Sequence, residues 1–344
     1  MEQSDSEVPL GVPRVRVGII YNLKKAGQHK SVDEQAEYDS IETVCGIRDA
    51  LNGAGCSAVL LEADTTLIDK LKQENIDIAF NIAEGIGGRA REGQVPAILE
   101  MLDIPHTGSD ATALCIALDK ALTKRLVSSY KVRTPKYAVL KRNSPVRLNG
   151  MRYPIIIKPV AEGSSKGISD VSVAKDRKEL TALLKRNFGV YDGDMLAEEY
   201  IEGREFTVGV IGNGKDRRIF PPMEIVYKQP TQDNYHVYSY GVKQEYKKFV
   251  EYKCPADIDK KTEDEIIQNT SRVCDALGCV DFARADYRVS QDGKAWFIEI
   301  NPLPGLAPGY SDFPMLAEFC GIKYDELVKN VLVAALKRYG MAEA

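Results

Sequence analysis

The 344-residue sequence has few of the residues on which several common functions depend. It holds three histidines and seven cysteines, and no two cysteines form a C-x-x-C pair. This pattern disfavours a zinc site, and the odd number of cysteines disfavours a disulfide framework. There is no run of 18 apolar residues, so no membrane span is predicted. The net charge of −4, without a basic run, gives no electrostatic basis for nucleic-acid binding.

The amino-terminal segment also lacks the pattern of a targeting signal. Residues 1–13 are polar and acidic and contain no apolar core, which predicts a disordered leader rather than a signal peptide. Scattered, unpaired cysteines suit a reducing compartment. We therefore expect a cytoplasmic protein. Its 344 residues, 44% of them hydrophobic, are enough to form the cores of two or three domains.

The first hundred residues alternate between the strand and helix periods. This alternation predicts a parallel sheet with helices on both faces, and ligands then gather at the carboxyl ends of the strands. The expected strands are 15–20, 57–61 and 77–83, and the expected helices are 37–52, 65–74 and 93–102.

After about residue 110 the pattern becomes α+β, and we expect domains at 14–110, 111–196 and 197–344. From residue 203 onward antiparallel strands dominate. The other expected elements are a helix at 112–130, paired strands around 136–140 and 154–158, a Gly/Ser loop at 162–167, a strand near 170–173, a helix at 176–187, a strand at 194–200 and a closing helix at 324–338.

A tyrosine-rich segment, 227–252, holds six tyrosines among polar residues. We expect a long mobile loop between strands, and loops of this kind often act as lids over an active site.

Another segment, 281–300, predicts a β-hairpin. Two apolar runs flank Asp292-Gly293, the strongest short hairpin signal. With that pair as the turn, Gln291 faces Lys294. The same register then pairs Asp286 with Glu299 and Arg284 with Asn301.

Such a hairpin brings chemically incompatible groups together. Asp286 and Glu299 would lie opposite each other, and like charges in that arrangement repel. A hard divalent cation removes the conflict, because carboxylates, an amide oxygen such as that of Asn301, and phosphates are the ligands of Mg²⁺. Arg284 alongside could hold a transferring phosphate. The alternative is a solvated strand face with incidental acidic residues.

A second candidate anion site follows a strand that ends in Lys158. The Glu162–Gly167 stretch combines glycines, which admit an anion close to the backbone, with serine hydroxyls that donate to phosphate oxygens. It is not a G-x-x-x-x-G-K-[ST] loop. A plain turn is the alternative, but a lysine that ends an apolar strand needs an anionic partner.

The stretch Met195–Glu205 runs from a strand into an acidic turn. Its backbone could read an adenine edge, and Glu205 could accept hydrogen bonds from ribose hydroxyls. A solvated acidic turn is the alternative.

Four segments in fixed order resemble the D-alanine–D-alanine ligases and related ATP-grasp enzymes. They are GSDATALCIALDKALTKRL, YPIIIKPVAEGSSKGISDV, LAEEYIEGREFTV, and DFARADYRV followed by WFIEINPLPGLAPGYSDFP. The resemblance covers roughly residues 14–340. It implies an ATP-grasp fold: an N-terminal Rossmann-like domain, then central and C-terminal ATP-grasp subdomains that hold a nucleotide between them.

The resemblance also implies roles for individual residues. On the nucleotide side these are Lys120 and Lys158 at the phosphates; Glu162, Gly163, Ser164 and Ser165 in the loop that closes over them; Glu198, Glu199, Tyr200 and Ile201 as the adenine hinge; Glu205 at the ribose; Ile298 beside the nucleotide; and Lys243 as a phosphate-contacting lysine of the mobile loop. The implied metal ligands are Asp286, Glu299 and Asn301, and the implied catalytic residues are Arg284, Lys243, Ser164 and Gly305, with Ser311 gripping the second substrate's carboxylate.

The sequence departs from the family on the substrate side. Counting without gaps from Ser40 puts Tyr38 where the family has a glutamate that binds the first substrate's amine, with Glu37 adjacent. The family's HGxxGEDG stretch reads NIAEGIGGRAREG, and its mobile-loop Lys-Tyr reads Lys243-Gln244. A phenol cannot neutralise an ammonium, so we expect a first acid that lacks the amine or places it elsewhere.

The predicted function is an ATP-dependent, ADP-forming ligase that joins a carboxylate to an amine through an acyl phosphate. The expected cofactors are ATP and Mg²⁺, with Mn²⁺ as an alternative, and the substrates are a small carboxylic acid and an amine such as an amino acid. A homodimer is compatible with the resemblance. A biosynthetic ligase for another first substrate, a true D-alanine–D-alanine ligase and a non-catalytic nucleotide-binding regulator all remain open.

Overall fold

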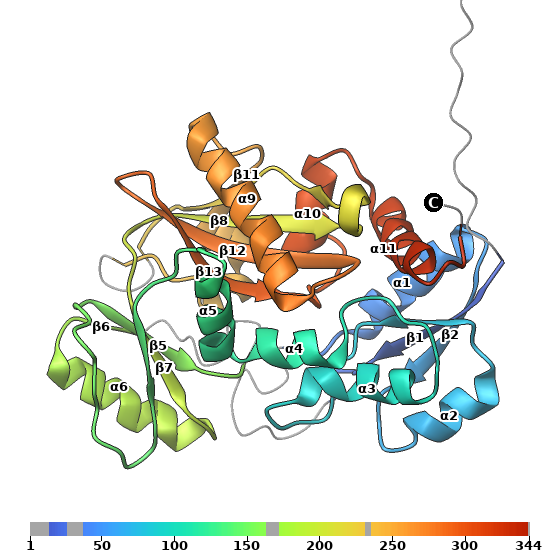
Figure 1. The fold of residues 1–344 in the computed structure, drawn as a ribbon, viewed down its shortest axis with the longest axis horizontal. Helices are drawn as coiled ribbons and strands as arrows, with labels where there is room; N and C mark the ends of the chain where they lie inside the picture. Colours follow the sequence, from blue (N-terminus) through green and yellow to red (C-terminus); the bar gives the residue numbers. More distant parts are fainter. Residues whose placement is uncertain (1–13, 26–36, 163–171, 231–234, 343–344) are drawn as a thin grey trace, which may run out of the picture.

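The computed structural model describes residues 14–25, 37–162, 172–230 and 235–342 (Figure 1). In these ranges the strands form three sheets, one parallel and two antiparallel. Within the same ranges, no helix is both long and apolar enough to cross a membrane.

The amino-terminal sheet is parallel, with strand order β2-β1-β3, as the alternating pattern predicts. Side chains of β1 alternate between its two faces: Val17 and Ile19 pack in one apolar cluster with α1 and α11, and Ile20 packs in another with α2 and α3. The elements are β1 (Arg16–Tyr21), β2 (Ser57–Glu62), β3 (Ile78–Asn81), α1 (Ile41–Gly53), α2 (Leu67–Glu74), η1 (Arg91–Gly93), α3 (Gln94–Met101) and α11 (Tyr324–Arg338).

Helix α1 begins later than expected. Its N-cap is Ser40, whose side chain accepts a hydrogen bond from the Thr43 amide, so the predicted start at residue 37 is wrong. A short bridge between Leu23 and Asp39 instead ties the preceding residues to the end of β1. Glu37 and Tyr38 therefore lie at the carboxyl edge of the sheet, where α/β folds bind ligands.

The second sheet is antiparallel, with order β4-β7-β5-β6. The strands expected to pair with each other, β4 and β5, are separated by β7, so that prediction is wrong. Both are short, and β7 supplies hydrogen-bond partners to each. The elements are β4 (Tyr137–Leu140), β5 (Ile155–Pro159), β6 (Val173–Ala174), β7 (Met195–Glu199) and the covering helix α6 (Arg177–Val190).

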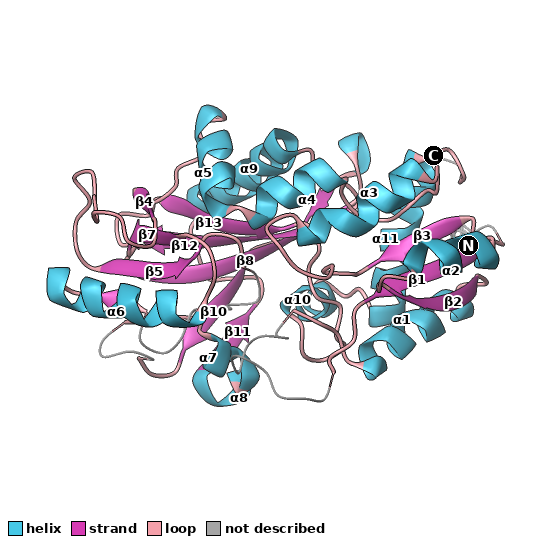
Figure 2. Cartoon of the chain, turned by 90° about the horizontal axis from the view of Figure 1, so that it is seen from below, coloured by secondary structure: helices cyan, strands magenta, loops and turns pink. Residues whose placement is uncertain are grey.

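The largest sheet has the order β11-β10-β8-β12-β13, with β9 paired to β8. Helices α5 (Lys120–Ser129) and α9 lie against each other and share an apolar cluster with the strands of this sheet (Figure 2). The elements are β8 (Gly203–Ile211), η2 (Gly214–Asp216), β9 (Arg218–Ile219), β10 (Met223–Tyr227), β11 (Val250–Lys253), α9 (Lys260–Leu277), β12 (Phe282–Ser290) and β13 (Ala295–Asn301).

The single helix expected at 112–130 is two helices, α4 (Ala111–Leu118) and α5 (Lys120–Ser129). Asp119 separates them in an extended conformation and accepts hydrogen bonds from the amides of Ala121 and Leu122, which caps α5. The break matters for function, because it makes Lys120 the first residue of α5.

Away from its loop the β12–β13 hairpin has the predicted register, although the loop itself differs from the prediction. Ser290 pairs with Lys294, which leaves a three-residue loop with Gly293 at φ 76°, so the expected pairing of Gln291 with Lys294 is wrong. A bulge between Asp286 and Tyr287 then shifts the pairing by one residue. The two offsets cancel, and Asp286 lies opposite Glu299, and Arg284 opposite Asn301, as predicted.

In the tyrosine-rich segment, the described residues are more ordered than a polar loop. They include two short helices, α7 (Tyr240–Gln244) and α8 (Tyr246–Phe249), and Val242 is buried. The hydroxyls of Tyr238 and Tyr252 lie 2.7 Å apart. The segment packs over β10 and β11, and whether it moves as a lid stays a prediction.

The apolar clusters combine helices and strands from different expected domains. Helices α4 and α5 contribute to the core of the largest sheet, and α10 (Asp312–Phe319) and α11 contribute to the core beside the amino-terminal sheet. Boundaries near residues 110 and 196 remain a prediction.

Candidate active site

A cavity of about 500 Å³ is lined by residues of the two antiparallel sheets and of the segments that follow β3 and precede α1. Most of the predicted site residues line it, although they come from distant parts of the chain. These are Glu37, Tyr38, Lys120, Lys158, Glu162, Glu198, Tyr200, Ile201, Glu205, Lys243, Arg284, Asp286, Ile298, Glu299, Asn301, Gly305 and Ser311. Glu199 is not in the lining, and Gly163, Ser164 and Ser165 lie outside the described residues.

The opposed carboxylates of the hairpin have different surroundings. Asp286 accepts hydrogen bonds from Thr207 (2.7 Å) and from Arg284 (2.9 and 3.1 Å). Glu299 Oε2 is buried and has no hydrogen-bond partner in the described part of the chain. The ammonium groups of Lys120 and Lys158 lie 3.7 and 3.8 Å from it, too far for hydrogen bonds.

An ionised carboxylate oxygen that has no hydrogen-bond partner is available to bind a metal ion. Burial opposes ionisation of Glu299, but Lys120 and Lys158 hold its pKa at about 2. The Asn301 carboxamide oxygen, next but one on β13, accepts a hydrogen bond from the Leu303 amide (2.9 Å) and keeps a second lone pair. With Asp286, these oxygens form a donor set that fits Mg²⁺.

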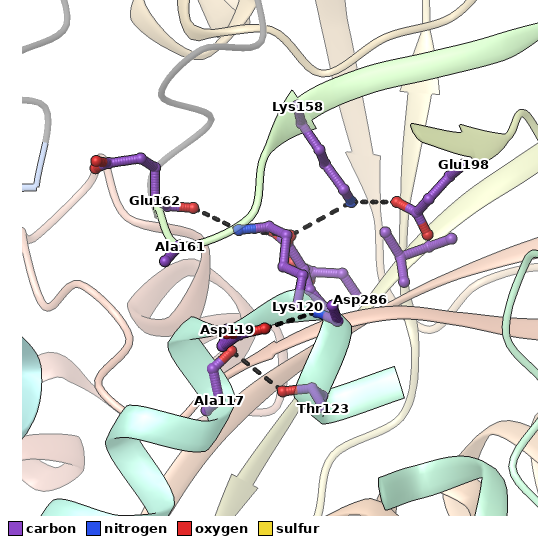
Figure 3. Close-up of polar contacts among 12 residues, drawn as sticks. Ala117, Asp119, Lys120, Thr123, Lys158, Ala161, Glu162, Glu198 and Asp286 are labelled. Atoms are coloured by element: carbon purple, nitrogen blue, oxygen red, sulfur yellow. Dashed lines mark hydrogen bonds and ion pairs between the residues drawn. The ribbon is translucent and has the colours of Figure 1, made fainter. Parts of the chain in front are cut away.

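Two lysines are held by one buried glutamate. Glu198 lies between Lys124 (2.6 Å) and Lys158 (2.7 Å), and all three side chains are almost fully buried. Figure 3 shows the contact between Lys158 and Glu198. Burial lowers the pKa of Lys124 to about 8. Lys158 thereby keeps its ammonium group at the cavity, so the Glu198 side chain orients a lysine that is predicted to contact phosphate. The part of Glu198 in an adenine hinge stays a prediction.

Lys120 lies between Glu299 of the hairpin and the predicted phosphate loop. Its ammonium group donates to the Glu162 carbonyl oxygen, as Figure 3 shows. Because Lys120 opens α5 and Glu162 opens the Gly/Ser stretch, this contact joins two segments that the resemblance assigns to ATP phosphates.

Arg284 is held from two sides. It pairs with Asp286 on its own strand and with Asp312 at the start of α10, 3.5 Å away. Asp312 also accepts a hydrogen bond from Tyr252 (3.0 Å), which lies hydroxyl to hydroxyl with Tyr238. The guanidinium is therefore fixed at the cavity, and its aspartate partner is tied to the tyrosine-rich segment.

The opposite end of the cavity has an arginine that the prediction missed. Arg288 donates to Glu205 (2.8 Å) and to the carbonyl oxygens of Ile201 (2.8 Å) and His236 (2.6 Å). Its guanidinium also lies over the ring of Tyr200, 4.6 Å from the centroid. Glu205 and Ile201, predicted to contact ribose and adenine, are thus positioned by Arg288.

Gly305 and Ser311 meet across a tight turn. A Cβ atom on Gly305 would lie 2.8 Å from Ser311 Oγ, closer than carbon and oxygen can approach without a shift. Ser311 Oγ accepts a hydrogen bond from the Ala307 amide (3.2 Å). The absence of a side chain at Gly305 therefore allows the serine hydroxyl to face this loop.

Replacing Gly305 with alanine should raise KM for the amine substrate about tenfold. The added Cβ atom would displace Ser311, which would lose its predicted hydrogen bond to that substrate's carboxylate, worth about 1–1.5 kcal/mol. Steady-state kinetics would measure this, and Ser311→Ala should give a similar increase that does not add to the first. Gly53→Ala is the control, since a Cβ there meets nothing within 4 Å. An unchanged KM in both site variants would contradict the contact's role.

At the amino-terminal edge of the cavity, the predicted substrate residues are already engaged. Glu37 pairs with Arg91 (2.5 Å), and the Tyr38 hydroxyl donates to the Gly85 carbonyl oxygen (3.1 Å). Two further carboxylates, Glu84 and Glu92, complete a group of three with Glu37 whose oxygens lie within 4.8 Å of one another.

Several of these residues escaped the sequence analysis for different reasons. Arg288 could have been predicted from the sequence, since period-2 alternation puts it on the same face of β12 as Arg284 and Asp286. Asp312 is the first residue of a helix, and no pattern distinguishes it from an ordinary N-terminal acidic residue. Glu84, Arg91 and Glu92 stand in the NIAEGIGGRAREG stretch, whose departure from the family marked the region without assigning roles.

Comparison with solved structures identifies the fold. D-alanine–D-alanine ligase from Bacillus anthracis, complexed with ATP, superposes with a TM-score of 0.74 at 23% identity, covering 95% of this chain and 99% of that one. VanG D-Ala:D-Ser ligase from Enterococcus faecalis superposes with a TM-score of 0.71 at 20% identity, covering 94% and 99%. The chain has the ATP-grasp fold, as expected from the resemblance.

Sequence comparison identifies the family. Residues 126–333 match the family described as "D-ala D-ala ligase C-terminus". A D-alanine–D-alanine ligase from Pseudomonas putida (strain GB-1) is 32% identical over 328 residues, which is 94% of each chain. The chain is an ATP-grasp, ADP-forming ligase. It belongs to the D-alanine–D-alanine ligase family.

Proposed function

We propose that this enzyme uses Mg-ATP to activate a carboxylic acid other than D-alanine as an acyl phosphate, which then reacts with an amine to form an amide. Mn²⁺ is an alternative metal. A cytoplasmic location, expected from the scattered cysteines and the polar amino-terminal segment, and a homodimer stay predictions.

The observation that carries this proposal is the engagement of Glu37 and Tyr38. These residues stand at or beside the position where the family binds the first substrate's amine. Glu37 already compensates Arg91 at 2.5 Å, and Tyr38 is neutral and bonded to the Gly85 carbonyl. An ammonium placed against these two residues, as in D-alanine, would find Glu37 already paired, and an unpaired buried charge costs several kcal/mol.

The reaction needs positioning and charge stabilisation more than a protein nucleophile. A carboxylate oxygen of the acid attacks the γ-phosphorus of ATP, and ADP leaves; the amine then attacks the acyl carbon, loses a proton, and phosphate leaves. Lys120 and Lys158 offset phosphate charge. Arg284, held by Asp286 and Asp312, donates to oxygens that gain charge in both steps. Lys243, which lines the same cavity, adds a further cation from α7.

Asp286, Glu299 and Asn301 are the residues that would hold the metal. When bound, Mg²⁺ neutralises negative charge on the phosphates during their transfer. The orphaned Oε2 of Glu299 supports this assignment, because no described residue satisfies it.

Trapping the acyl phosphate with hydroxylamine tests the first step without knowledge of the second substrate. Hydroxylamine attacks the acyl carbon and releases phosphate, so any accepted acid gives a hydroxamate together with ADP. We expect hydroxamate from several carboxylic acids, with kcat/KM for at least one about tenfold or more above that for D-alanine.

Other outcomes would identify the remaining candidates. The relatives named D-alanine–D-alanine ligases favour that activity as the second candidate, and D-alanine as the best first substrate would establish it and refute our proposal. If nucleotide binds but no acid in the panel yields ADP, the chain is a nucleotide-binding protein without turnover.

A further inference from the structure

Three carboxylates from separate segments meet at the amino-terminal edge of the cavity. Glu37 precedes α1, Glu84 follows β3, and Glu92 lies in η1, and their oxygens are within 4.8 Å of one another. All three line the same cavity as Arg284 and Lys243. The group therefore lies within the active-site cavity, not on an outer surface.

The charges of this group are only partly compensated. Arg91 lies 2.5 Å from Glu37 and 3.4 Å from Glu162, so its one positive charge is already shared. Neither Glu84 nor Glu92 has a hydrogen bond or ion pair with any residue in the described ranges. Glu92 is only 6% exposed, and what remains exposed faces the cavity.

This arrangement is unfavourable without a ligand. Burial raises the pKa of Glu84 well above its usual value, and burial raises that of Glu92 to about 7, with the charge of Glu37 adding to it. A buried carboxylate normally has a partner, and leaving one without a partner is strongly destabilising. Buried Glu92 and half-buried Glu84 lie side by side without such a partner in the described ranges, which indicates that the partner comes from outside the protein.

The chemistry of that partner follows from the count of charges. Once Arg91 is set against Glu37, Glu84 and Glu92 remain as two carboxyl groups, and Lys243 and Lys120 act on them only electrostatically, without a close ion pair. A cation bound against each would favour its ionised form. A divalent metal would find only these two carboxylates, with a guanidinium beside them, whereas Mg²⁺ or Ca²⁺ prefers six or more oxygens. An ammonium offers three donors and approaches a carboxylate oxygen to about 2.8 Å, but it carries one positive charge, so two ammonium groups are needed to neutralise both carboxylates.

We propose that the first substrate is a diamino acid, whose two ammonium groups bind at Glu84 and Glu92 while its carboxylate lies at Arg284. D-Alanine carries a single ammonium and would leave one of the two carboxylates uncompensated. This inference rests on the proposed function, since it names the class of acid that the ligase activates.

Matched pairs of acids test the inference directly. Ornithine and norvaline differ only in the terminal amino group, and so do 2,4-diaminobutyrate and 2-aminobutyrate. In the hydroxylamine assay, with both enantiomers of each, the diamino member of at least one pair should exceed its partner in kcat/KM about tenfold to a hundredfold, the range expected for charged hydrogen bonds. Equal values within every pair would overturn the proposal.

Variants separate recognition from folding. Glu92→Gln should abolish the preference within the pair and leave KM for ATP within about twofold. It should also raise the melting temperature, because it removes a buried carboxyl group whose ionisation is unfavourable without a ligand. Glu318→Gln makes the same change at an exposed position on α10 and should alter neither quantity. A preference that survives in both Glu84→Gln and Glu92→Gln would refute the assignment.

Failure of the proposed function would be distinguishable from failure of this inference. If no acid yields hydroxamate, calorimetry of ornithine and norvaline, with a non-hydrolysable ATP analogue bound, still decides whether Glu92 binds the second amine. A titration with Mn²⁺ in the absence of nucleotide tests the remaining alternative, that the three carboxylates bind a metal ion. Mn²⁺ binding that is lost in Glu92→Gln, together with no difference between ornithine and norvaline, would make the group a metal site and overturn the proposal.

Discussion

Replacing Asp286 with asparagine and Glu299 with glutamine together should reduce ADP formation about a thousandfold or more. A bound cation contributes several kcal/mol of charge stabilisation to phosphoryl transfer, and each 1.4 kcal/mol is a factor of ten in rate. The fold should survive, because the two changes keep the side-chain volumes and remove two opposed negative charges from neighbouring strands. A coupled ADP assay across a Mg²⁺ titration measures the effect.

The control for this double variant is Asp292→Asn in the loop of the same hairpin. Asp292 is half exposed and pairs only with the neighbouring Lys294 among described charged groups, so activity should stay at the wild-type level. Wild-type ADP formation in the double variant, at any Mg²⁺ concentration, would remove the metal site from the mechanism.

The second large effect is expected on stability. Replacing Glu198 with glutamine leaves Lys124 and Lys158 buried without the carboxylate that now lies 2.6 and 2.7 Å from them. Removing one partner from a buried ion pair costs about 3–5 kcal/mol, so the free energy of unfolding should fall by that amount. Denaturant unfolding of the nucleotide-free protein measures it.

The neighbouring Glu199→Gln is a matched control. Its carboxylate is partly exposed and accepts one hydrogen bond, from the Arg152 amide, so its replacement should cost about 1 kcal/mol or less. Adding Lys124→Met to Glu198→Gln should recover part of the loss, because it removes one of the uncompensated ammonium groups. Equal stabilities for Glu198→Gln and the wild type would show that the two lysines need no partner.

The metal-site hairpin shows how a sequence argument can be right at one end of an element and wrong at the other. The Asp-Gly signal located the turn, and period-2 alternation put Arg284 and Asp286 on one face. The loop has three residues and not two, and a bulge beside Glu299 restores the register. Neither deviation has a signature in single-residue preferences, since a bulge is set by the packing of both neighbouring strands.

Other features depend on contacts that no local pattern records. The Glu198 side chain points to Lys124 and Lys158, which come from a helix and from another strand. Glu84 and Glu92 approach Glu37 only because the irregular segments after β3 and before α1 meet at one edge of the sheet. A family resemblance places residues that match its motifs, and these substrate-side residues depart from those motifs.

Helix α11 gives the chain a constraint on the order in which it can fold during synthesis. In Figure 1 the last helix lies beside α1, and the two share one apolar cluster with the amino-terminal sheet. Arg338, at the end of α11, also pairs with Asp281 and donates to the carbonyl oxygen of His106. A nascent chain that has already released the first hundred residues from the ribosome therefore cannot bury one face of their sheet until almost the whole protein has been made. That face stays open to chaperones, and to other exposed chains, for most of translation.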